Sequence, residues 1–464
     1  MAWPASARRA PLSLMLTATC ALAGCSMVPT YERPSVPTQA AWAAQPGASI
    51  AGVPVSADWW QHFESPELDQ LMAEALAANQ DIAAAIARID QARANTRIAG
   101  APLLPNVEAT GSTSGTLTRN RQRTHTGSSG EAVLTASYEI DLWGKNAAGL
   151  EASKHALNAS IFDREALALV VQSEVASTYF DAVSLRQRLA IARENLAAAQ
   201  QVLKLVQIQM AQGAATALDL AQQRTAVATF EAEIPTLEQQ LEADQTSLAI
   251  LLGRAPGGTA VARDKLDALA LPTIAAGQPA ELLGRRPDIA EAEANLKAAN
   301  ADIGVARAAF YPSLTLSASA ALSGLATSGT STAASIAAGL VAPIFEGGQL
   351  EGQLDLTKAR KEELVATYRQ TVLTSFKEVE DALSTIQTSA ARVKSLQTAA
   401  DQAREAFRLA QLSYGAGASD FLTVLDAQRT LLDNEDSLVQ AQRDRFTAAA
   451  GLFKALGGGW AGTA

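Results

Sequence analysis

The C-terminal part of the chain carries a carboxylate and a guanidinium three residues apart, Asp426 and Arg429. They follow two glycines, Gly415 and Gly417, which interrupt a very long helical pattern that restarts at Ser419. A break of this kind predicts the tip of a helical hairpin. Residues three apart share one face of a helix, so the plain chemistry of this pair is a surface ion pair worth about 0.2 to 0.5 kcal/mol.

Capping explains only some of the polar residues at the tips. Ser419 is placed to cap the returning helix, and Asp420 would then lie in its first turn, beside the positive end of the helix dipole. Asp426 would lie two turns inside, where neither a cap nor the dipole requires a carboxylate. An earlier tip has the Thr-x-x-Asp spacing of a capping box, Thr216 and Asp219, so capping explains Asp219 as well as a functional role does.

No arrangement of residues typical of an enzyme accompanies these charges. His62, His125 and His155 lie in unlike segments, without a spacing that would let them share a metal ion. Lys145 follows a single glycine and lacks the glycine-rich loop of a phosphate site. The sequence therefore predicts no catalytic residue, no metal site and no nucleotide cofactor.

The remaining reactive side chain is the thiol of Cys25. A basic pair, Arg8-Arg9, precedes a short apolar run at 11–21, which is the form of a secretion signal. The run ends in Leu-Ala-Gly-Cys at 22–25, which resembles the lipobox of bacterial lipoproteins. The resemblance implies that residues 1–24 are a signal peptide and that Cys25 carries a covalent lipid, such as palmitate. The alternative is a general signal followed by an incidental cysteine.

Charge and hydropathy limit the partners. Loss of Arg8 and Arg9 from the 37 basic residues leaves 35 against 47 acidic residues, so nucleic acid is disfavoured as a partner. Cys20 leaves with the signal, and one cysteine cannot form a disulfide within the mature chain. No later stretch has the roughly 18 consecutive apolar residues of a transmembrane helix. A lipid anchor or a β-structure must therefore make any membrane contact.

Most of the mature chain predicts unusually long helices. The pattern from 146 to about 212 has no proline and would span roughly 100 Å, too long for a compact domain. Its heptad seam, and that of a second long helix, pairs large with small residues as in an antiparallel coiled coil. The first seam has Leu189, Leu196, Leu203 and Met210 beside Ala192, Ala199 and Val206; the second has Val393, Ala400, Phe407 and Tyr414 beside Leu396, Ala403 and Ala410.

The same features occur twice, about 205 residues apart, which predicts an internal duplication. After an extended leader at 25–57, the first repeat covers 58–260 and the second 261–464. The anchors are Asp81-Ile82 with Asp288-Ile289, Pro105 with Pro312, Gly144 with Gly347, Glu174-Val175 with Glu378-Val379, and Gln223-Arg224-Thr225 with Gln428-Arg429-Thr430. The period is far longer than the 20 to 50 residues of a solenoid repeat, so two large halves are expected.

Each half contains a segment with period two, at about 105–141 and 312–345, which predicts a β-hairpin. In 313–323 one face is apolar and the other is mostly Ser and Thr, and polar loops are expected at 119–130 and 324–335. Such alternation fits a membrane barrel with a wet lumen, or else two hairpins of a soluble sandwich. Because membrane barrels need about eight strands, four strands per chain require an oligomer. Dimer, trimer and tetramer all remain open from the residues alone.

Five motifs in this order resemble the TolC-like outer membrane efflux protein family, in its NodT-type lipoprotein branch. They are Arg285–Ile289, Phe310–Leu314, Pro343–Gly348, Tyr414–Arg429 and Ala455–Trp460. The resemblance implies a mixed α and β membrane protein: a homotrimer with a twelve-stranded outer-membrane barrel, four strands from each chain, and an α-helical periplasmic tunnel. It also implies an equatorial belt built from 58–76, 255–280 and the C-terminus.

The same resemblance implies a function and a site. The chain would be the lipid-anchored exit duct of a tripartite efflux or secretion system, passing small molecules supplied by an inner-membrane pump through a periplasmic adaptor. Asp426, Leu422 and Arg429 match the periplasmic gate of the family, and Tyr414 matches a latch residue, with Asp219 as its expected partner. The segment 415–419 departs from the family pattern, in which a basic residue is common. The rival hypothesis is a lipid-anchored coiled-coil adaptor or spacer, which would leave the four strands unexplained.

Overall fold

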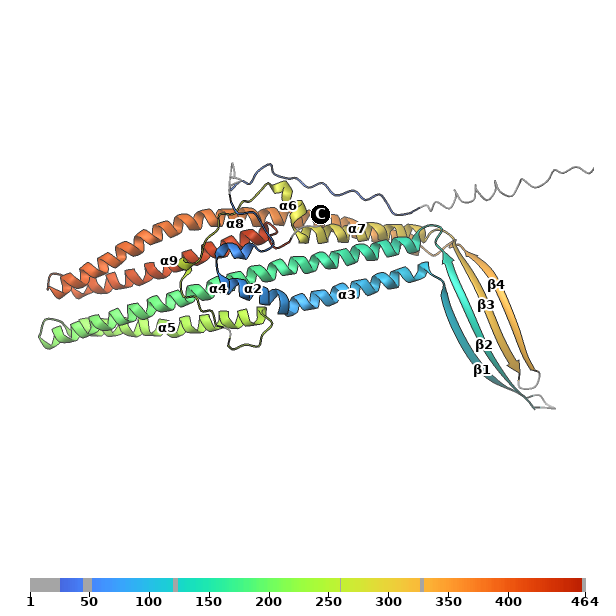
Figure 1. Ribbon diagram of the computed structural model, residues 1–464, viewed down its shortest axis with the longest axis horizontal. Coiled ribbons are helices and arrows are strands. Elements are labelled where there is room, and N and C mark those ends of the chain that lie inside the picture. The colour runs from blue at the N-terminus through green and yellow to red at the C-terminus, as the bar shows by residue number, and fades with distance from the viewer. Residues whose placement is uncertain (1–25, 45–51, 120–123, 259, 326–328, 461–464) are drawn as a thin grey trace, which may run out of the picture. The chain divides into compact units, whose positions relative to one another are not determined.

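The computed structural model describes residues 26–44, 52–119, 124–258, 260–325 and 329–460 (Figure 1). Residues 1–25, with the signal peptide and Cys25, lie outside the described part. The helices are α2 (Pro66–Ala78), α3 (Gln80–Gly100), α4 (Lys145–Ala211), α5 (Ala217–Leu251), α6 (Leu282–Arg285), α7 (Pro287–Ala308), α8 (Gln349–Gly415) and α9 (Phe421–Ala455), and the strands are β1 (Asn106–Arg119), β2 (Thr124–Ile140), β3 (Ser313–Leu325) and β4 (Gly329–Val341).

The chain divides into two units, and α3, α4, α7 and α8 contribute to both. One unit contains 1–35, 87–161 and 291–369, and therefore all four strands. The other contains 36–86, 162–290 and 370–464, with the helical hairpins α4–α5 and α8–α9. None of the helices in the described ranges combines the length and the apolarity needed to cross a membrane.

The strands form one antiparallel sheet in the order β1-β2-β3-β4. The register keeps the predicted apolar residues on one face, because Val107 lies opposite Ala136, and Leu314 opposite both Ile140 and Leu340. The other face carries paired serines: the hydroxyls of Ser114 and Ser129 are 2.7 Å apart, those of Ser319 and Ser335 2.8 Å, and those of Ser323 and Ser331 2.7 Å. The predicted period of two is confirmed.

The strands are longer than the polar composition of their ends predicts. The expected loops at 119–130 and 324–335 are wrong, because main-chain pairing continues through Gly130–Thr113 and Ser335–Ser319 up to the residues at 120–123 and 326–328. The ladder joins backbone groups, so runs of Ser, Thr and Gly can extend it where no core is needed. The paired strands of both hairpins therefore extend through most of the positions that were predicted to be loops.

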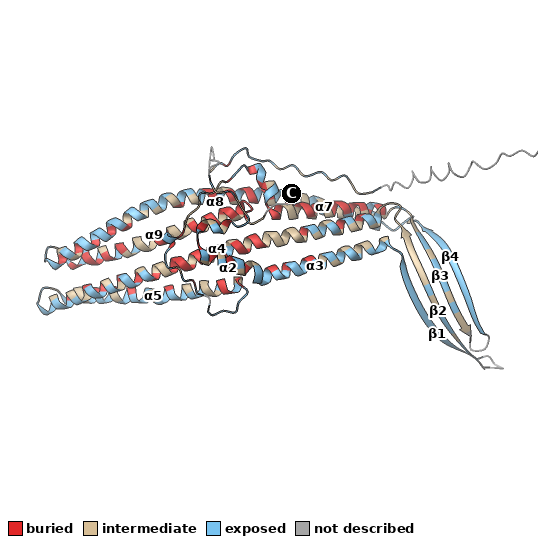
Figure 2. Ribbon diagram, viewed as in Figure 1, coloured by how far each residue is buried: buried red, intermediate tan, exposed pale blue. Residues whose placement is uncertain are grey.

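The sheet is open, and its outer strands are exposed. β1 and β4 each pair along one edge only within the described residues, and every residue of both strands is exposed (Figure 2). Free N–H and C=O groups along a strand edge template pairing with another chain. A sheet with two such edges is incomplete as a unit.

The second unit has a core where the three predicted belt segments meet. Trp59 stacks on Phe453 with ring centroids 5.1 Å apart, and its indole N–H donates to Gln172 Oε1 at 3.2 Å. Val261 and Leu266 are buried in the same cluster. Residues from 58–76, from the crossing between the halves and from the C-terminal helix therefore share one core, as expected.

The two hairpins pack along small-residue seams, with corrections in both. The second seam is confirmed from Ala400 onward, where Ala400, Ala403, Phe407, Ala410 and Tyr414 are all buried, but Val393 and Leu396 are only half-buried. In the first seam Ala192, Ala199 and Val206 are buried as expected, but Leu196 and Leu203 are only half-buried and Met210 is exposed. Their places are taken by Asn195 and Val202, one residue earlier. A straight helix drifts from a 3.5-residue repeat, so the buried stripe shifts along 67 residues.

Helices α2 and α3 are separated by a break at Asn79. Asn79 Oδ1 accepts hydrogen bonds from the backbone N–H groups of Asp81 and Ile82, at 3.0 and 3.1 Å. Gly253, just beyond α5, has a left-handed φ of 69°, and a Cβ there would overlap the carbonyl oxygen of Ala78. The end of α5 is thus held against the break by a close backbone approach.

We expect Gly253→Ala to destabilise the protein by about 2 to 5 kcal/mol, since a left-handed residue other than glycine costs about 1 to 2 kcal/mol and overpacking costs about 1 to 3 kcal/mol. Gly213→Ala is the matched control. Gly213 also has a positive φ, 76°, but a Cβ added there would have no neighbouring atom within 4 Å. Thermal unfolding followed by circular dichroism in detergent measures both. Equal losses in the two variants would show that the approach to Ala78 contributes nothing.

Candidate functional site

The two hairpin tips have the same backbone design. Gly213 and Gly417 both have positive φ angles, 76° and 71°. Their N–H groups donate to the carbonyls of Met210 and Tyr414, each at 3.0 Å, and the next N–H reaches back to the helix at 2.8 Å in both tips. This pattern ends a helix with a left-handed glycine. The predicted glycine tips and their equivalence are therefore confirmed.

The cap of α9 is Asp420, and the prediction of Ser419 is wrong. Asp420 Oδ1 accepts from the Thr423 hydroxyl at 2.6 Å and from its backbone N–H at 2.9 Å, and these bonds hold the pKa of Asp420 below its usual range. An ionised carboxylate is a stronger acceptor at a helix N-terminus than a hydroxyl. The Ser419 hydroxyl is buried without a partner among the described residues.

Comparison of the two halves of the sequence could have identified Asp420 as the cap. Thr216 caps α5, and its capping box with Asp219 is confirmed: Asp219 N–H donates to Thr216 Oγ1 at 3.2 Å, and Thr216 N–H donates to Asp219 Oδ2 at 2.8 Å. An offset of 204 residues aligns Thr216 with Asp420 and Asp219 with Thr423. The two halves use the same pair of residue types in opposite order.

Leu422, Asp426 and Arg429 are exposed near the start of α9, and their i, i+4, i+7 spacing places them on one face. Leu422 and Asp426 line a groove of about 600 Å³ between α8 and α9, and Leu422 is 60% exposed. Neither charged side chain forms an ion pair or a side-chain hydrogen bond with any described residue. The surface pair between Asp426 and Arg429, which would have explained both residues, is therefore absent from the described structure of a single chain.

Tyr414 lies at the end of α8 and is 7% exposed. Its ring packs on Phe421 with centroids 5.6 Å apart. Burial raises the pKa of Tyr414, and the charge of Asp219 raises it further, so the two residues are close enough to interact electrostatically. The Tyr414 hydroxyl has no hydrogen-bond partner within the described chain, while Asp219 is held by Thr216. Within one chain the expected latch contact is not formed.

Two buried glutamines near the tips were missed as site residues. Gln223 and Gln428 each begin a copy of the repeated Gln-Arg-Thr triplet, and both are 0% exposed. Gln223 Nε2 donates to the carbonyl of Ala199 at 2.8 Å and so links α5 to α4. Neither polar atom of Gln428 has a partner in the described structure. The repeated Gln-Arg-Thr triplet was the available signal, but burial could not be read from it.

The leader lies on α7 in the unit that contains the sheet. Arg33 Nη2 pairs with Glu293 Oε2 at 2.5 Å, and Asn300 Nδ2 donates to the carbonyl of Pro29 at 2.7 Å. Ser26 lies at the junction that follows β2, since a Cβ on Gly144 would be 3.7 Å from its Cα. The residue directly after Cys25 is therefore held next to the end of a strand.

No cluster of three or more His, Cys, Asp and Glu in the described ranges could hold a metal ion. The site therefore consists of an apolar side chain, two unpaired charges and a buried phenol at the tip of the α8–α9 hairpin. Such residues can restrict and select what passes, but they form no nucleophile–base pair.

Comparison with known proteins shows the class. The family model described as outer membrane efflux protein matches residues 71–254 and 279–458. The pyoverdine export outer membrane protein OpmQ of Pseudomonas aeruginosa is 43% identical over 87% of each chain, and that of Pseudomonas putida is 41% identical over 97% of this chain and 96% of its own. A crystal structure of the open state of the MtrE outer membrane channel of Neisseria gonorrhoeae has a TM-score of 0.84 at 29% identity, covering 94% of this chain and 98% of that one.

The chain therefore belongs to the outer membrane efflux protein family. It is an efflux channel protein of the outer membrane and not an enzyme, and the family requires no cofactor for its activity. The mixed helical and four-stranded fold is the fold of these channels.

We expect Gln428→Met to raise the stability of the protein by about 1 to 3 kcal/mol, because a buried polar group without a partner costs that much. Gln223→Met is the matched control: it also removes one buried unpaired oxygen, but it loses the hydrogen bond to Ala199, worth about 0.5 to 1.5 kcal/mol, so we expect a smaller gain than in Gln428→Met. Thermal unfolding of the detergent-solubilised variants measures both. A loss of stability in both variants to the same extent would contradict the unpaired state of Gln428.

Proposed function

We propose that this protein is the trimeric exit duct of a tripartite efflux or secretion system, a passive conduit gated at its periplasmic end. The observation that carries the proposal is the open four-stranded sheet in the same chain as two helices of 67 residues each. A sheet in lipid must close, because no water satisfies its edges. Three copies would supply twelve strands, which lies within the range of membrane barrels.

The two faces of the sheet support this assembly. The apolar face, with Val107, Leu316 and Leu340, suits lipid, and the serine-lined face suits a wet lumen. β4 of one copy would pair with β1 of the next, and the alternating strand direction would be kept all round the barrel. A soluble coiled-coil spacer would leave both exposed strand edges without a purpose.

Energy and cargo would come from partners. An inner-membrane pump would supply the energy, and a periplasmic adaptor would join it to the helical end of the duct. The cargo would be small molecules selected mainly by the pump. Both OpmQ relatives are named for pyoverdine export, which makes pyoverdine the first cargo to test.

Asp426, Leu422 and Arg429 form the gate in this proposal. Three copies of Asp426 around an axis would make a carboxylate ring that attracts cations, and Leu422, one turn away, would add an apolar constriction. Their exposure and lack of partners in one chain support contacts with neighbouring copies. The Tyr414 hydroxyl, buried and unpaired near Asp219, would complete the latch when the hairpins of adjacent copies meet.

We expect the purified chain to form trimers and to open pores in planar bilayers. Asp426→Ala combined with Arg429→Ala should raise the closed-state conductance by about tenfold, since loss of roughly 1.4 kcal/mol of closed-state contact shifts the equilibrium by that factor. Asp433→Ala is a control on the same helix, further from the tip and exposed. Unchanged conductance in the double variant would reject the gate, and a chain that forms no pores would favour the coiled-coil spacer.

We also propose that Cys25 is the lipidated N-terminus of the mature chain. The leader contacts at Arg33, Pro29 and Ser26 hold the following residues at the strand end, where an acyl chain would reach the membrane that surrounds the barrel.

Metabolic labelling with palmitate should mark the wild-type protein and not Cys25→Ser, because only a cysteine thiol at the cleavage site accepts the diacylglycerol group. Intact-mass measurement should show a mature chain that begins at residue 25 with the added lipid. A mature chain with an unmodified N-terminus, cleaved at another position, would contradict the assignment.

A further inference from the structure

Arg286 occupies the break between α6 and α7, in the unit that contains both hairpins. The proline that follows it disfavours helical angles at the preceding residue, and Arg286 has extended angles, φ −105° and ψ 123°. Arg286 is 8% exposed. The break therefore turns a guanidinium inward rather than continuing the helix.

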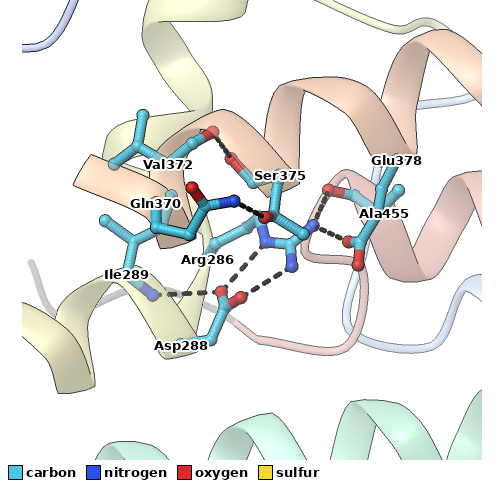
Figure 3. Close-up of polar contacts among 9 residues, drawn as sticks. Arg286, Asp288, Ile289, Gln370, Val372, Ser375, Glu378 and Ala455 are labelled. Atoms are coloured by element: carbon cyan, nitrogen blue, oxygen red, sulfur yellow. Dashed lines mark hydrogen bonds and ion pairs between the residues drawn. The ribbon is translucent and has the colours of Figure 1, made fainter. Parts of the chain in front are cut away.

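This guanidinium joins three elements (Figure 3). Arg286 Nη1 donates to Glu378 Oε2 on α8 at 2.6 Å and to the carbonyl of Ala455, the last residue of α9, at 3.1 Å. Nε and Nη2 bind the two carboxylate oxygens of Asp288 at 2.9 and 2.6 Å. Only a planar, forked side chain can make these contacts together, so lysine is not equivalent to arginine here.

The contacts fix both helices of one hairpin at the same height. Glu378 precedes the end of α8 at Gly415 by 37 residues, and Ala455 follows the start of α9 at Phe421 by 34. At 1.5 Å per residue, each contact lies roughly 50 to 55 Å from the tip. Because one nitrogen binds both helices, α9 cannot slide along α8 without breaking a buried, charged hydrogen bond.

The duplicated position in the first half lacks this double contact. Asn79, equivalent to Arg286, donates from Nδ2 to the carbonyl of Leu251, the last residue of α5, at 2.9 Å. Glu174, equivalent to Glu378, is exposed and has no side-chain partner within the described structure. At this position Asn79 therefore binds only α5 of its hairpin, whereas Arg286 binds both helices of the hairpin that carries Leu422 and Asp426.

We propose that Arg286 is a positioning residue of the gate, which sets the axial register of α8 against α9 and thereby the height of Leu422 and Asp426 in the closed state. The inference rests on the proposed function and adds a remote determinant to it. It also gives a reason for the difference between Asn79 and Arg286: the contact to both helices occurs in the hairpin that carries the gate.

The test compares matched variants of the full chain in planar bilayers. Arg286→Asn installs the residue of the first half, and we expect a rise in open probability of about tenfold, within the range typical of coupling between distant sites. Glu378→Gln should raise it in the same direction but less, and Glu174→Gln should leave it unchanged. Arg286→Lys should recover only part of the closed state. Heat resistance of the trimer, measured on the same samples, separates a shifted gate from a damaged fold.

Several results would overturn the inference. Wild-type open probability in Arg286→Asn would do so if Asp426→Ala with Arg429→Ala is leaky in the same assay. If Arg286→Asn fails to assemble, the glutamate pair decides, and equal conductance in Glu378→Gln and Glu174→Gln rejects the register role. A rise in open probability that follows the loss of trimer heat resistance in every variant also rejects it. Failure of the wild-type chain to form pores would instead remove the proposed function itself.

Discussion

The backbone groups along the outer edges of β1 and β4 set the constraint on which the rest of this protein depends. Each edge presents unpaired N–H and C=O groups, and a membrane offers no water to satisfy them. Four strands from one chain cannot close on themselves at the size of known membrane barrels. In the proposed assembly, identical copies would close the sheet, and the two halves of each chain would each contribute one hairpin to the shared wall.

Duplication supplies the framework, and differences between the halves supply the asymmetry. Left-handed glycines occur at equivalent places, Gly213 with Gly417 and Gly253 with Gly457, because backbone turns and close approaches tolerate no Cβ there. The polar residues around this framework have diverged. Asn79 and Arg286 show the difference most clearly, since both bind the end of a returning helix but only the arginine also reaches the other helix of its hairpin.

Local patterns predicted the elements well because each pattern has a local cause. Alternation of side chains follows from the strand itself, and glycine tips follow from the steric cost of a left-handed residue. The errors lie where two neighbouring residues could both take the same role. Ser419 and Asp420 are both good caps, and the carboxylate prevailed; Leu196 and Leu203 look like seam residues, but the drift of a long helix turned Asn195 and Val202 inward. Polar strand ends looked like loops because composition does not report main-chain pairing.

The sequence by itself determined the repeat, the hairpins, the helix lengths, the candidate lipid site at Cys25 and the gate candidates at Leu422, Asp426 and Arg429. The repeat, the hairpins and the helix lengths depend on residue order over short distances or on comparison of the two halves, whereas the candidate lipid site and the gate candidates come from the resemblance of local motifs to known families. Only the tertiary structure decided that Gln428 is buried and unpaired, that Asp426 and Arg429 do not pair within the chain, and that Arg286 links α8 to α9. The Arg286 contact brings together side chains that lie 92 residues apart in sequence, Arg286 and Glu378, and no local pattern encodes a contact over that distance.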